Sequence, residues 1–475
     1  MAKQVNATDV KINKLEIYGA TGRYDLIPHM LELNIYENIF RPFLSANLVL
    51  TDSHNIPYKL PIVGEETVDI DISRAGYAGS SDEKRLSIRP PRLHVNSLRD
   101  KYFTKPKTQV FSLHLLSEQY MSSIHSKVSK SYRGKKISSI VDNIYFKYLF
   151  DGERGMFFEP TDKSENIIIP NLSPIDAIQW LARRSVSEKG SGVNYLFYET
   201  INESYFTSLD TLVSEEPVKT FIFRPRIDDS TGVGFIKENF FKIDKFEFKN
   251  QFNKTHHTER GTYSSKLITH DIVKKEISQH EYTGYNEWFA LNHCGDFPPL
   301  SNSQMEIKSA NVNRTSHAPP AIDNNFPTTT ERELGKMIDS NVHFYPKHDQ
   351  LYAKDYDDLY NNNAEEWKLK RGPHLGHFDD GIILILFVSG NSSLRVGQTV
   401  ILNLPSPETS DKDKKTDVVE DLFLSGKYLV TAIRHIFAQG SISDPKIAYT
   451  MQVEVRKDGV EEMVPIREAR DREEL

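Results

Sequence analysis

Apolar and polar residues alternate along the N-terminal part of the chain, and this period of two restricts the fold more than any other feature. Residues 31–35 read Leu-Glu-Leu-Asn-Ile, and residues 68–72 read Val-Asp-Ile-Asp-Ile. Successive side chains of a strand point to opposite faces, so each segment has one apolar face that suits a half-buried antiparallel sheet. Residues 86–89 and 110–115 continue the pattern. The sequence therefore predicts a β-rich domain over residues 10–125.

After Lys130 the spacing of apolar residues becomes that of a helix, and two helices are predicted. A second helix is predicted from Ser173, because serine is a favoured N-cap, Pro174 suits the first turn, and Asp176 stands where an acid accepts free N–H groups. Strand-like segments follow at 193–200, 204–206 and 220–223. Residues 126–236 are therefore predicted to form an α+β domain. The first helix is predicted from apolar residues spaced three and four apart, which are Ile137, Ile140, Val141, Ile144 and Tyr148.

The strand pattern returns at 241–248 and, much later, at 381–389, 399–404, 427–437 and 449–455. We interpret these segments as a second β-domain in two parts, 237–290 and 366–460. The stretch between them, 291–365, carries two Pro-Pro pairs and three successive asparagines, and is predicted to be a loop-rich insertion. The charged end, 461–475, is expected to be a solvated tail.

Composition excludes several classes of protein. The 475 residues are enough for roughly three domains. A net charge of -7 gives no long-range attraction to nucleic acid or to an anionic membrane. The single cysteine, Cys294, cannot form an intrachain disulfide, which fits assembly in a reducing cytoplasm. Residues 1–10 lack a signal-peptide core, and the most apolar run, 382–388, is far shorter than the roughly 20 residues of a membrane-spanning helix.

The sequence contains none of the local motifs that identify common enzymes. Phosphate loops, dinucleotide fingerprints, HExxH zinc signatures, Gly-x-Ser-x-Gly elbows and Cys-x-x-Cys pairs are all missing. A pair of carboxylates could serve a glycosidase, but sequence separation alone does not place two of them at a working distance. No catalytic, cofactor-binding or metal-binding residue is therefore assigned, and a non-enzymatic protein is favoured.

Two histidine pairs could supply metal ligands. His374 and His377 are three residues apart, with Asp379 and Asp380 nearby. Gly372-Pro373 and Gly376 argue against a helix there, so a surface loop is favoured over a metal site. His256 and His257 lie in a polar segment, 253–258, and are predicted to be solvated turn residues.

A group of basic residues before the first predicted helix could touch passing nucleic acid. A solvated approach to that helix is the favoured interpretation. The group interleaves with Tyr132 and comprises Lys127, Lys130, Arg133, Lys135 and Lys136.

Four runs, taken together, resemble one protein family. The first is RPFLSANLVL at 41–50, followed by Asp52-Ser53 and by LPIVGEE at 60–66. The second is LSPIDAIQWLARRS at 172–185 with YLFY at 195–198, and the third is GTYSSKLITHD at 261–271. The fourth joins LRVGQTV at 394–400 to GKYLVTAIRH at 426–435. In order and spacing these runs resemble the baseplate hub proteins of contractile-tailed bacteriophages, whose relatives form the head of type VI secretion spike proteins.

The resemblance covers about 10–290 and 366–460, and the insertion 291–365 has no counterpart in it. It implies an α+β, β-rich chain with two tube-like antiparallel β-barrel domains, the first at 10–125 and the second at 237–290 together with 366–460. The α+β domain at 126–236 would lie between them and face the spike.

The resemblance also implies a structural role without a cofactor. Three copies would form a ring that adapts a hexameric tail tube to a trimeric central spike. The implied partners are the tail tube ring, the spike and other baseplate proteins, with DNA only in transit through the pore and no membrane. The location would be the tail baseplate of the virion, after assembly in the host cytoplasm. Open barrel edges would join neighbouring subunits. Alternatives are another tail structural protein, a peptidoglycan-degrading tail enzyme and a receptor- or glycan-binding tail protein.

Overall fold

A computed structural model of the chain describes residues 9–74, 86–162, 164–190, 192–223, 241–272, 274–299, 341–347, 364–406, 421, 423–439 and 447–461. The chain divides into two compact units. Unit 1 comprises residues 1–249, 383–421 and 427–456, and unit 2 comprises 250–382, 422–426 and 457–475. The fold is α+β and rich in strands, as the sequence predicts.

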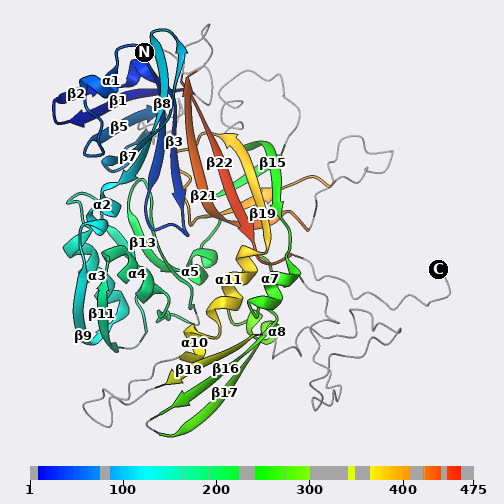
Figure 1. Cartoon of the computed structure of the whole chain (residues 1–475). Coiled ribbons are helices and arrows are strands. Elements are labelled where there is room, and N and C mark those ends of the chain that lie inside the picture. Colours follow the sequence, from blue (N-terminus) through cyan, green and yellow to red (C-terminus); the bar gives the residue numbers. More distant parts are fainter. Residues whose placement is uncertain are drawn as a thin grey trace, which may run out of the picture. The chain divides into compact units, whose positions relative to one another are not determined.

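Eight strands of unit 1 close into a ring, counted over the described residues. Each strand pairs antiparallel with two others, in the order β1-β5-β7-β8-β4-β3-β21-β22 and back to β1. Figure 1 shows β3, β21 and β22 side by side. The strands are β1 (Asp9–Gly19), β3 (Met30–Asn38), β4 (Ser45–Asp52), β5 (Thr67–Arg74), β7 (Leu93–Lys105), β8 (Thr108–Ser117), β21 (Gly426–Gln439) and β22 (Ile447–Lys457).

The alternation seen in the sequence fills this ring. In β4 the side chains of Ala46, Leu48 and Leu50 are completely buried, whereas Asn47 and Val49 between them are partly exposed. The predicted strands at 31–35, 68–72, 86–89 and 110–115 are confirmed in β3, β5, β6 (Leu86–Ile88) and β8. Two short elements, β2 (Gly22–Asp25) and α1 (Ile56–Lys59), lie outside the ring.

A second ring uses the hairpin β21–β22 again. Its order is β22-β19-β15-β14-β20-β21, and the pairing of β21 with β22 closes it. Most of the pairing described in unit 1 is antiparallel, but β14 is parallel to both β15 and β20. The additional strands are β14 (Lys219–Phe223), β15 (Lys242–Asn250), β19 (Ile382–Ser389) and β20 (Thr399–Asn403).

The two rings share β21 and β22 because these strands are long. Residue 430 of β21 bonds through its backbone to residues 397 and 398, next to β20, whereas residues 432–438 pair with β3. The eight-stranded ring therefore takes six strands from residues 9–117 and two from the C-terminal part of the chain. Residues 10–125 do not close it alone, and the division of the chain into two barrel domains stays a prediction.

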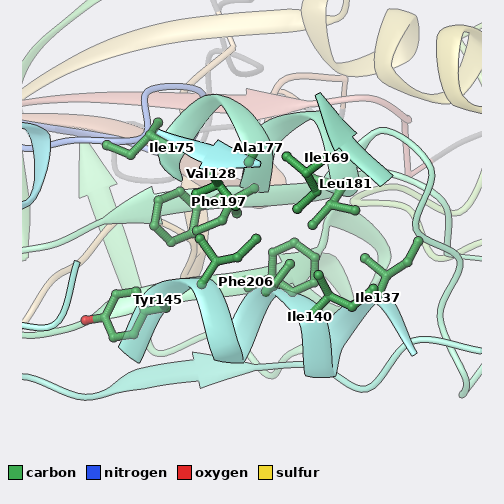
Figure 2. Packing of buried hydrophobic residues seen from close by; sticks show 14 of the residues in the cluster. Val128, Ile137, Ile140, Tyr145, Ile169, Ile175, Ala177, Leu181, Phe197 and Phe206 are labelled. Carbon is green, nitrogen blue, oxygen red and sulfur yellow. The ribbon is translucent and has the colours of Figure 1, made fainter. Parts of the chain in front are cut away.

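The segment between β8 and β14 forms a separate core within unit 1. Its helices are α2 (Glu118–Ile124), α3 (Ile137–Tyr148), α4 (Pro174–Ala182) and α5 (Leu209–Ser214). Figure 2 shows Ile140 and Tyr145 of α3 packing toward Leu181 of α4 and Phe206 of β13. The strands are β9 (Val128–Lys136), β10 (Met156–Phe158), β11 (Ser164–Leu172), β12 (Tyr195–Glu199) and β13 (Ser204–Ser208).

Both helices predicted in this segment are confirmed. The apolar stripe of α3 is buried, with Ile140, Val141 and Ile144 completely inaccessible. At the start of α4, the Ser173 Oγ accepts a hydrogen bond from the Asp176 backbone N–H at 3.2 Å and donates one to the Asp176 carboxylate at 2.6 Å. The N-cap chemistry read from the sequence therefore starts α4 at Pro174.

Unit 2 contains a three-stranded sheet in the order β17-β16-β18. The elements are α7 (Lys254–Glu259), β16 (Ser264–Asp271), β17 (Glu276–Thr283), α8 (Gly284–Trp288), β18 (Val342–Lys347), α10 (Ala364–Trp367) and α11 (Arg371–Asp379). Within 237–290, β15 belongs to the large sheet, whereas β16 and β17 belong to this small one. In the insertion 291–365, β18 pairs with β16, while most of the insertion and residues 462–475 of the tail lie outside the described residues.

A buried carboxylate connects three segments of the α+β part of unit 1. Glu159 is 1% exposed, and its oxygens accept hydrogen bonds from the hydroxyls of Ser187, Thr207 and Ser208 and from the Ser208 N–H. Burial alone would raise the pKa of Glu159, but these hydrogen bonds outweigh burial and hold the pKa below its usual value.

Replacing Glu159 with glutamine should destabilise the protein by roughly 1–3 kcal/mol, because one acceptor becomes an NH₂ group that faces donors. Because the folded-state pKa is depressed, the wild type should keep this stabilisation above about pH 4.5 and lose it as the pH falls further. Thermal unfolding midpoints of both proteins, measured from about pH 3 to about pH 7, would test the loss of stability and its pH dependence. The prediction fails if E159Q and wild type have the same midpoint at neutral pH.

Candidate functional site

The α+β part of unit 1 is fixed to the eight-stranded ring by buried charges. Glu199, at the end of β12, is completely buried and accepts a hydrogen bond from the Leu44 backbone N–H, just before β4, at 2.9 Å. Arg154 reaches the other oxygen of Glu199 at 2.9 Å and also binds Asp151 at 2.8 Å. Burial raises the pKa of Glu199 despite the opposing guanidinium. A second contact, from the Ile201 N–H to the Glu37 carboxylate at 2.7 Å, supports the same junction.

A hollow of about 310 Å³ lies on unit 1 beside this junction and is lined mainly by residues of β3, β21 and β22. Its carboxylates come from Glu37 and Glu454. Glu37 accepts the Ile201 N–H, and Glu454 binds Lys249 at 2.7 Å and Arg456 at 2.9 Å. Both carboxylates therefore make structural contacts. They are not assigned as the carboxylate pair that a glycosidase would use.

Exposed aromatic and apolar side chains occur at several places in unit 1, among them two groups of aromatic residues. The tip of the β7–β8 hairpin exposes Tyr102 (55%) and Phe103 (71%). At the end of α3, Phe146 and Phe150 are also largely exposed, with ring centroids 5.2 Å apart. Single exposed apolar residues are normal on a protein surface, so these groups are of interest only because aromatic residues lie next to one another.

The expectation of open edges in the barrels stays a prediction. Each ring strand has a hydrogen-bonded neighbour on both sides, but some of these pairings are short. The pairing of β5 with β7 joins only residues 67–68 to residues 93–94, so most of β7 lies beyond it on that edge. The ends of the large sheet are β2 and β6, and β17 and β18 are the outer strands of the small sheet of unit 2.

The basic residues predicted to precede a helix do so, because strand β9, which carries all of them except Lys127, ends at Lys136 where α3 begins. This strand pairs antiparallel with β11, and its polar side chains are largely exposed. Lys136 forms an ion pair with Glu188 at 2.9 Å, and Lys130 lies over the Tyr132 ring. The solvated interpretation agrees with this exposure.

The surface loop predicted for His374 and His377 is wrong. Both residues lie on helix α11 and are buried, with 1% and 6% of their surfaces exposed. Pro373 falls in the first turn, where a backbone N–H has no helical partner to lose. Gly376 allows close packing, because a Cβ there would lie 2.5 Å from the Thr262 hydroxyl oxygen. These residues fit the helix that they had seemed to exclude.

The turn predicted for His256 and His257 is also wrong. The segment forms helix α7, which Asn253 caps by accepting the His256 N–H at 3.2 Å. His257 is 5% exposed, and burial lowers its pKa although Asp380 opposes this shift. Asn253 three residues before His256 was the sequence signal that could have identified the cap.

Four histidines of unit 2 form a chain of ring contacts in which two, His293 and His377, touch Trp288, and sequence reasoning missed His293. The His293 ring stacks on the Trp288 ring with centroids 3.5 Å apart, and the His377 ring meets the Trp288 ring edge-on at 5.1 Å. Burial, with His293 as the next cause, lowers the pKa of His374 to about 3, and burial also places the pKa of His377 well below its usual value. The imidazoles of His374 and His377 are therefore neutral at physiological pH.

His293 belongs to a group that contains His374 and Asp458. One nitrogen or oxygen atom from each of the three lies within 4.8 Å of the others. A second group of this kind, in unit 1, consists of His29, Asp52 and His54. Asp379 and Asp380, the carboxylates near His374 in the sequence, pair with Arg260.

Comparisons with known proteins found similar solved structures only at low sequence identity. No family model and no curated protein matches the chain. A tail protein from Neisseria meningitidis is 11% identical, with 94% of this chain and 97% of that chain covered and a TM-score of 0.49. A 43 kDa tail protein of prophage MuSo2 from Shewanella oneidensis is 9% identical, with 94% and 98% covered and a TM-score of 0.48.

An E. coli component of the type VI secretion system, described as similar in structure to the T4 bacteriophage tail proteins gp27 and gp5, is 8% identical. The alignment covers 94% of this chain and 76% of that chain, with a TM-score of 0.40. Since no family model matches, the role of this chain is inferred from its own residues and strand pairing. Within the described residues, no helix has both the length and the apolar run needed to cross a bilayer.

Replacing Arg154 with leucine should destabilise the protein by roughly 3–5 kcal/mol, because it leaves a buried carboxylate without its cation. The matched control is R395L, since Arg395 pairs with Glu203 at 3.4 Å where both side chains are 38% exposed, and such pairs contribute about 0–1 kcal/mol. Guanidinium unfolding midpoints would measure both effects. Equal midpoints for the two variants would contradict a structural role for the Arg154–Glu199 pair.

Proposed function

We propose that the chain is a non-enzymatic, structural hub of a phage tail baseplate. Three copies form a ring that joins a hexameric tail tube to a trimeric central spike and leaves a pore for DNA. The observation that carries this proposal is the presence of two closed strand rings in one polypeptide, joined through the hairpin β21–β22. The runs that resemble baseplate hub proteins supply the family to which this architecture is compared.

The geometric reason is a mismatch of symmetry between the proposed partners. A sixfold tube and a threefold spike do not present matching surfaces, and closed symmetric assemblies require matching contacts. A subunit that carries two similar modules repeats its contact twice, so three subunits offer six sites. Because β21 and β22 belong to both rings, the two modules are held at a fixed separation, which such an adaptor requires.

The remaining parts of the proposal concern partners and location. The tube would stack on one face of the ring and the spike on the other, next to the α+β residues 126–236, with other baseplate proteins at the periphery. A net charge of -7 suits a pore through which DNA slides without being held. We place the assembled protein in the tail baseplate of the virion, after assembly in the host cytoplasm.

Contacts between subunits would come from exposed apolar side chains and from the parts of strand edges that lie beyond the pairing within the ring. The β7–β8 hairpin suits this role, because its tip exposes the aromatic side chains of Tyr102 and Phe103. Interfaces between permanent partners commonly exceed about 1,600 Å² in total and are apolar at their centre.

The purified full-length chain should be a trimer. Light scattering should give about three times the monomer mass of 54.6 kDa, and electron-microscope class averages should show an annulus with threefold order and six peripheral densities. A monomer at all concentrations, with no annular particles in the presence of its spike and tube proteins, would contradict the hub proposal.

Replacing Tyr102 and Phe103 together with serine should weaken the trimer by at least about tenfold in its dissociation constant, if each buried side chain contributes 1 kcal/mol or more. The matched control is K105S, on the same hairpin and also exposed. Sedimentation velocity over a concentration series would measure the change. If the double variant and the control associate equally well, this hairpin is not a subunit contact, and the adaptor proposal is tested by the annulus alone.

A further inference from the structure

Three segments of unit 2 that are far apart in the sequence meet at one buried point. They are the loop after α8, helix α11 and the residues that follow β22. A backbone bridge joins Phe297 to Val460, with N–H to O distances of 2.9 and 2.7 Å. A Cβ on Gly295 would lie 2.4 Å from the Gly459 carbonyl carbon, so the two chain segments touch through their backbones. This contact fixes the neighbouring residues His293 and Asp458 in position.

Hydrogen bonds fix the orientations of His293 and Asp458. The His293 Nε2 lies 3.0 Å from the Trp288 carbonyl oxygen, which only accepts hydrogen bonds. The His293 Nδ1 lies 2.6 Å from a carboxylate oxygen of Asp458, which is the distance of a direct hydrogen bond. To bind one ion at about 2 Å each, these two atoms would have to move slightly apart. The other Asp458 oxygen accepts the Cys294 N–H at 2.8 Å, which fixes the carboxylate.

His374 is the member of this group whose ring nitrogens lack a partner among the described residues. Its side chain is 1% exposed. Buried polar groups in native proteins nearly always have partners, because leaving one unpaired is unfavourable. A proton shared by His293 and Asp458 leaves His374 unpaired, whereas a metal ion bound by all three residues satisfies it.

We propose that His293, His374 and Asp458 bind a divalent transition metal ion, with Zn²⁺ as the best fit. Neutral imidazole nitrogens and a carboxylate are common zinc ligands, at about 2.0–2.2 Å from the ion. Ligand atoms within 4.8 Å of one another can reach such an ion with small side-chain movements. The site is buried and joins three distant segments, so the ion would act as a structural cross-link.

The Trp288 carbonyl would act as an outer partner of the site. Ligating histidines commonly donate their other ring N–H to a carbonyl or carboxylate, which fixes the tautomer and the ring orientation. His293 already makes this contact, and its stacking on Trp288 restricts the ring further. The orientation that a metal ligand needs is therefore built before any ion binds.

The second histidine and aspartate group does not require an ion. In unit 1, His29 Nδ1 lies 3.0 Å from the Thr51 carbonyl oxygen, and the Asp52 carboxylate accepts hydrogen bonds from the N–H groups of His54 and Ile56 and from the Gln109 amide. His54 is exposed. That group is therefore satisfied by its own hydrogen bonds, in contrast to His374.

The test is the metal content of the full-length protein, grown with added Zn²⁺, purified without a metal-affinity step and dialysed. Wild type should retain about one zinc ion per chain by mass spectrometry, whereas H374A and D458N should retain only traces. The matched control is H270A, since His270 is an exposed histidine of the same unit, and it should retain zinc like wild type. The unfolding midpoint of wild type should rise with Zn²⁺ concentration and fall with a chelator.

Two further measurements cover variants that do not fold. H374Q keeps most of the side-chain volume, and circular dichroism would report whether it folds. X-ray absorption at the zinc edge of wild type should require two imidazole ligands, whatever the variants do. A wild type that stays free of zinc with an unchanged unfolding midpoint, or zinc bound without imidazole ligands, would overturn the proposal. Neither outcome depends on the oligomeric state, so the hub proposal is tested separately.

Discussion

The pairing of β21 with both β3 and β20 is the constraint on which unit 1 depends. A strand has two edges, and β21 uses one edge for β22 along most of its length while it divides the other between the two rings. Each ring is therefore closed by strands that the other ring also needs. Closure reduces the length of free strand edge, and free edges are templates for uncontrolled association.

Buried charges fix the α+β residues to this framework. Glu159 connects the segment around Ser187 to the end of β13 within that part, while Glu199 and Arg154 connect it to the start of β4. Burying ionised groups is costly, and such groups persist when every lone pair has a donor in the right place. Apolar packing alone permits many orientations of one module against another, whereas these hydrogen bonds are satisfied in only one. A rigid relation between the modules is what an adaptor of fixed geometry needs.

In unit 2, buried histidines rather than buried carboxylates lie where distant segments meet. Neutral imidazoles are tolerated inside a protein more readily than charged ones, and the low pKa of His374 reflects that preference. His293 and Asp458 are 165 residues apart in sequence, yet the contact of Gly295 with Gly459 brings them within hydrogen-bonding distance. A metal ion there would replace part of the hydrophobic core that a small three-stranded sheet cannot build alone, since its described core comprises only Leu267, Tyr282, Ala364 and Leu369 with two partly buried aromatic residues.

The sequence by itself determined the local structure: the strands of alternating polarity, the stripe of helix α3 and the Ser173 cap of α4 depend on neighbours a few residues away. It did not determine the ring closure, because β3 pairs with a strand about four hundred residues later, as the Arg434 contact with Asn34 illustrates. Nor did it reveal the burial of His257, His374 and His377, since a polar segment rich in glycine is buried only when other segments cover it. Gly376 illustrates the reason: its effect on the helix is local, but the Thr262 hydroxyl that makes glycine necessary is supplied by the tertiary structure.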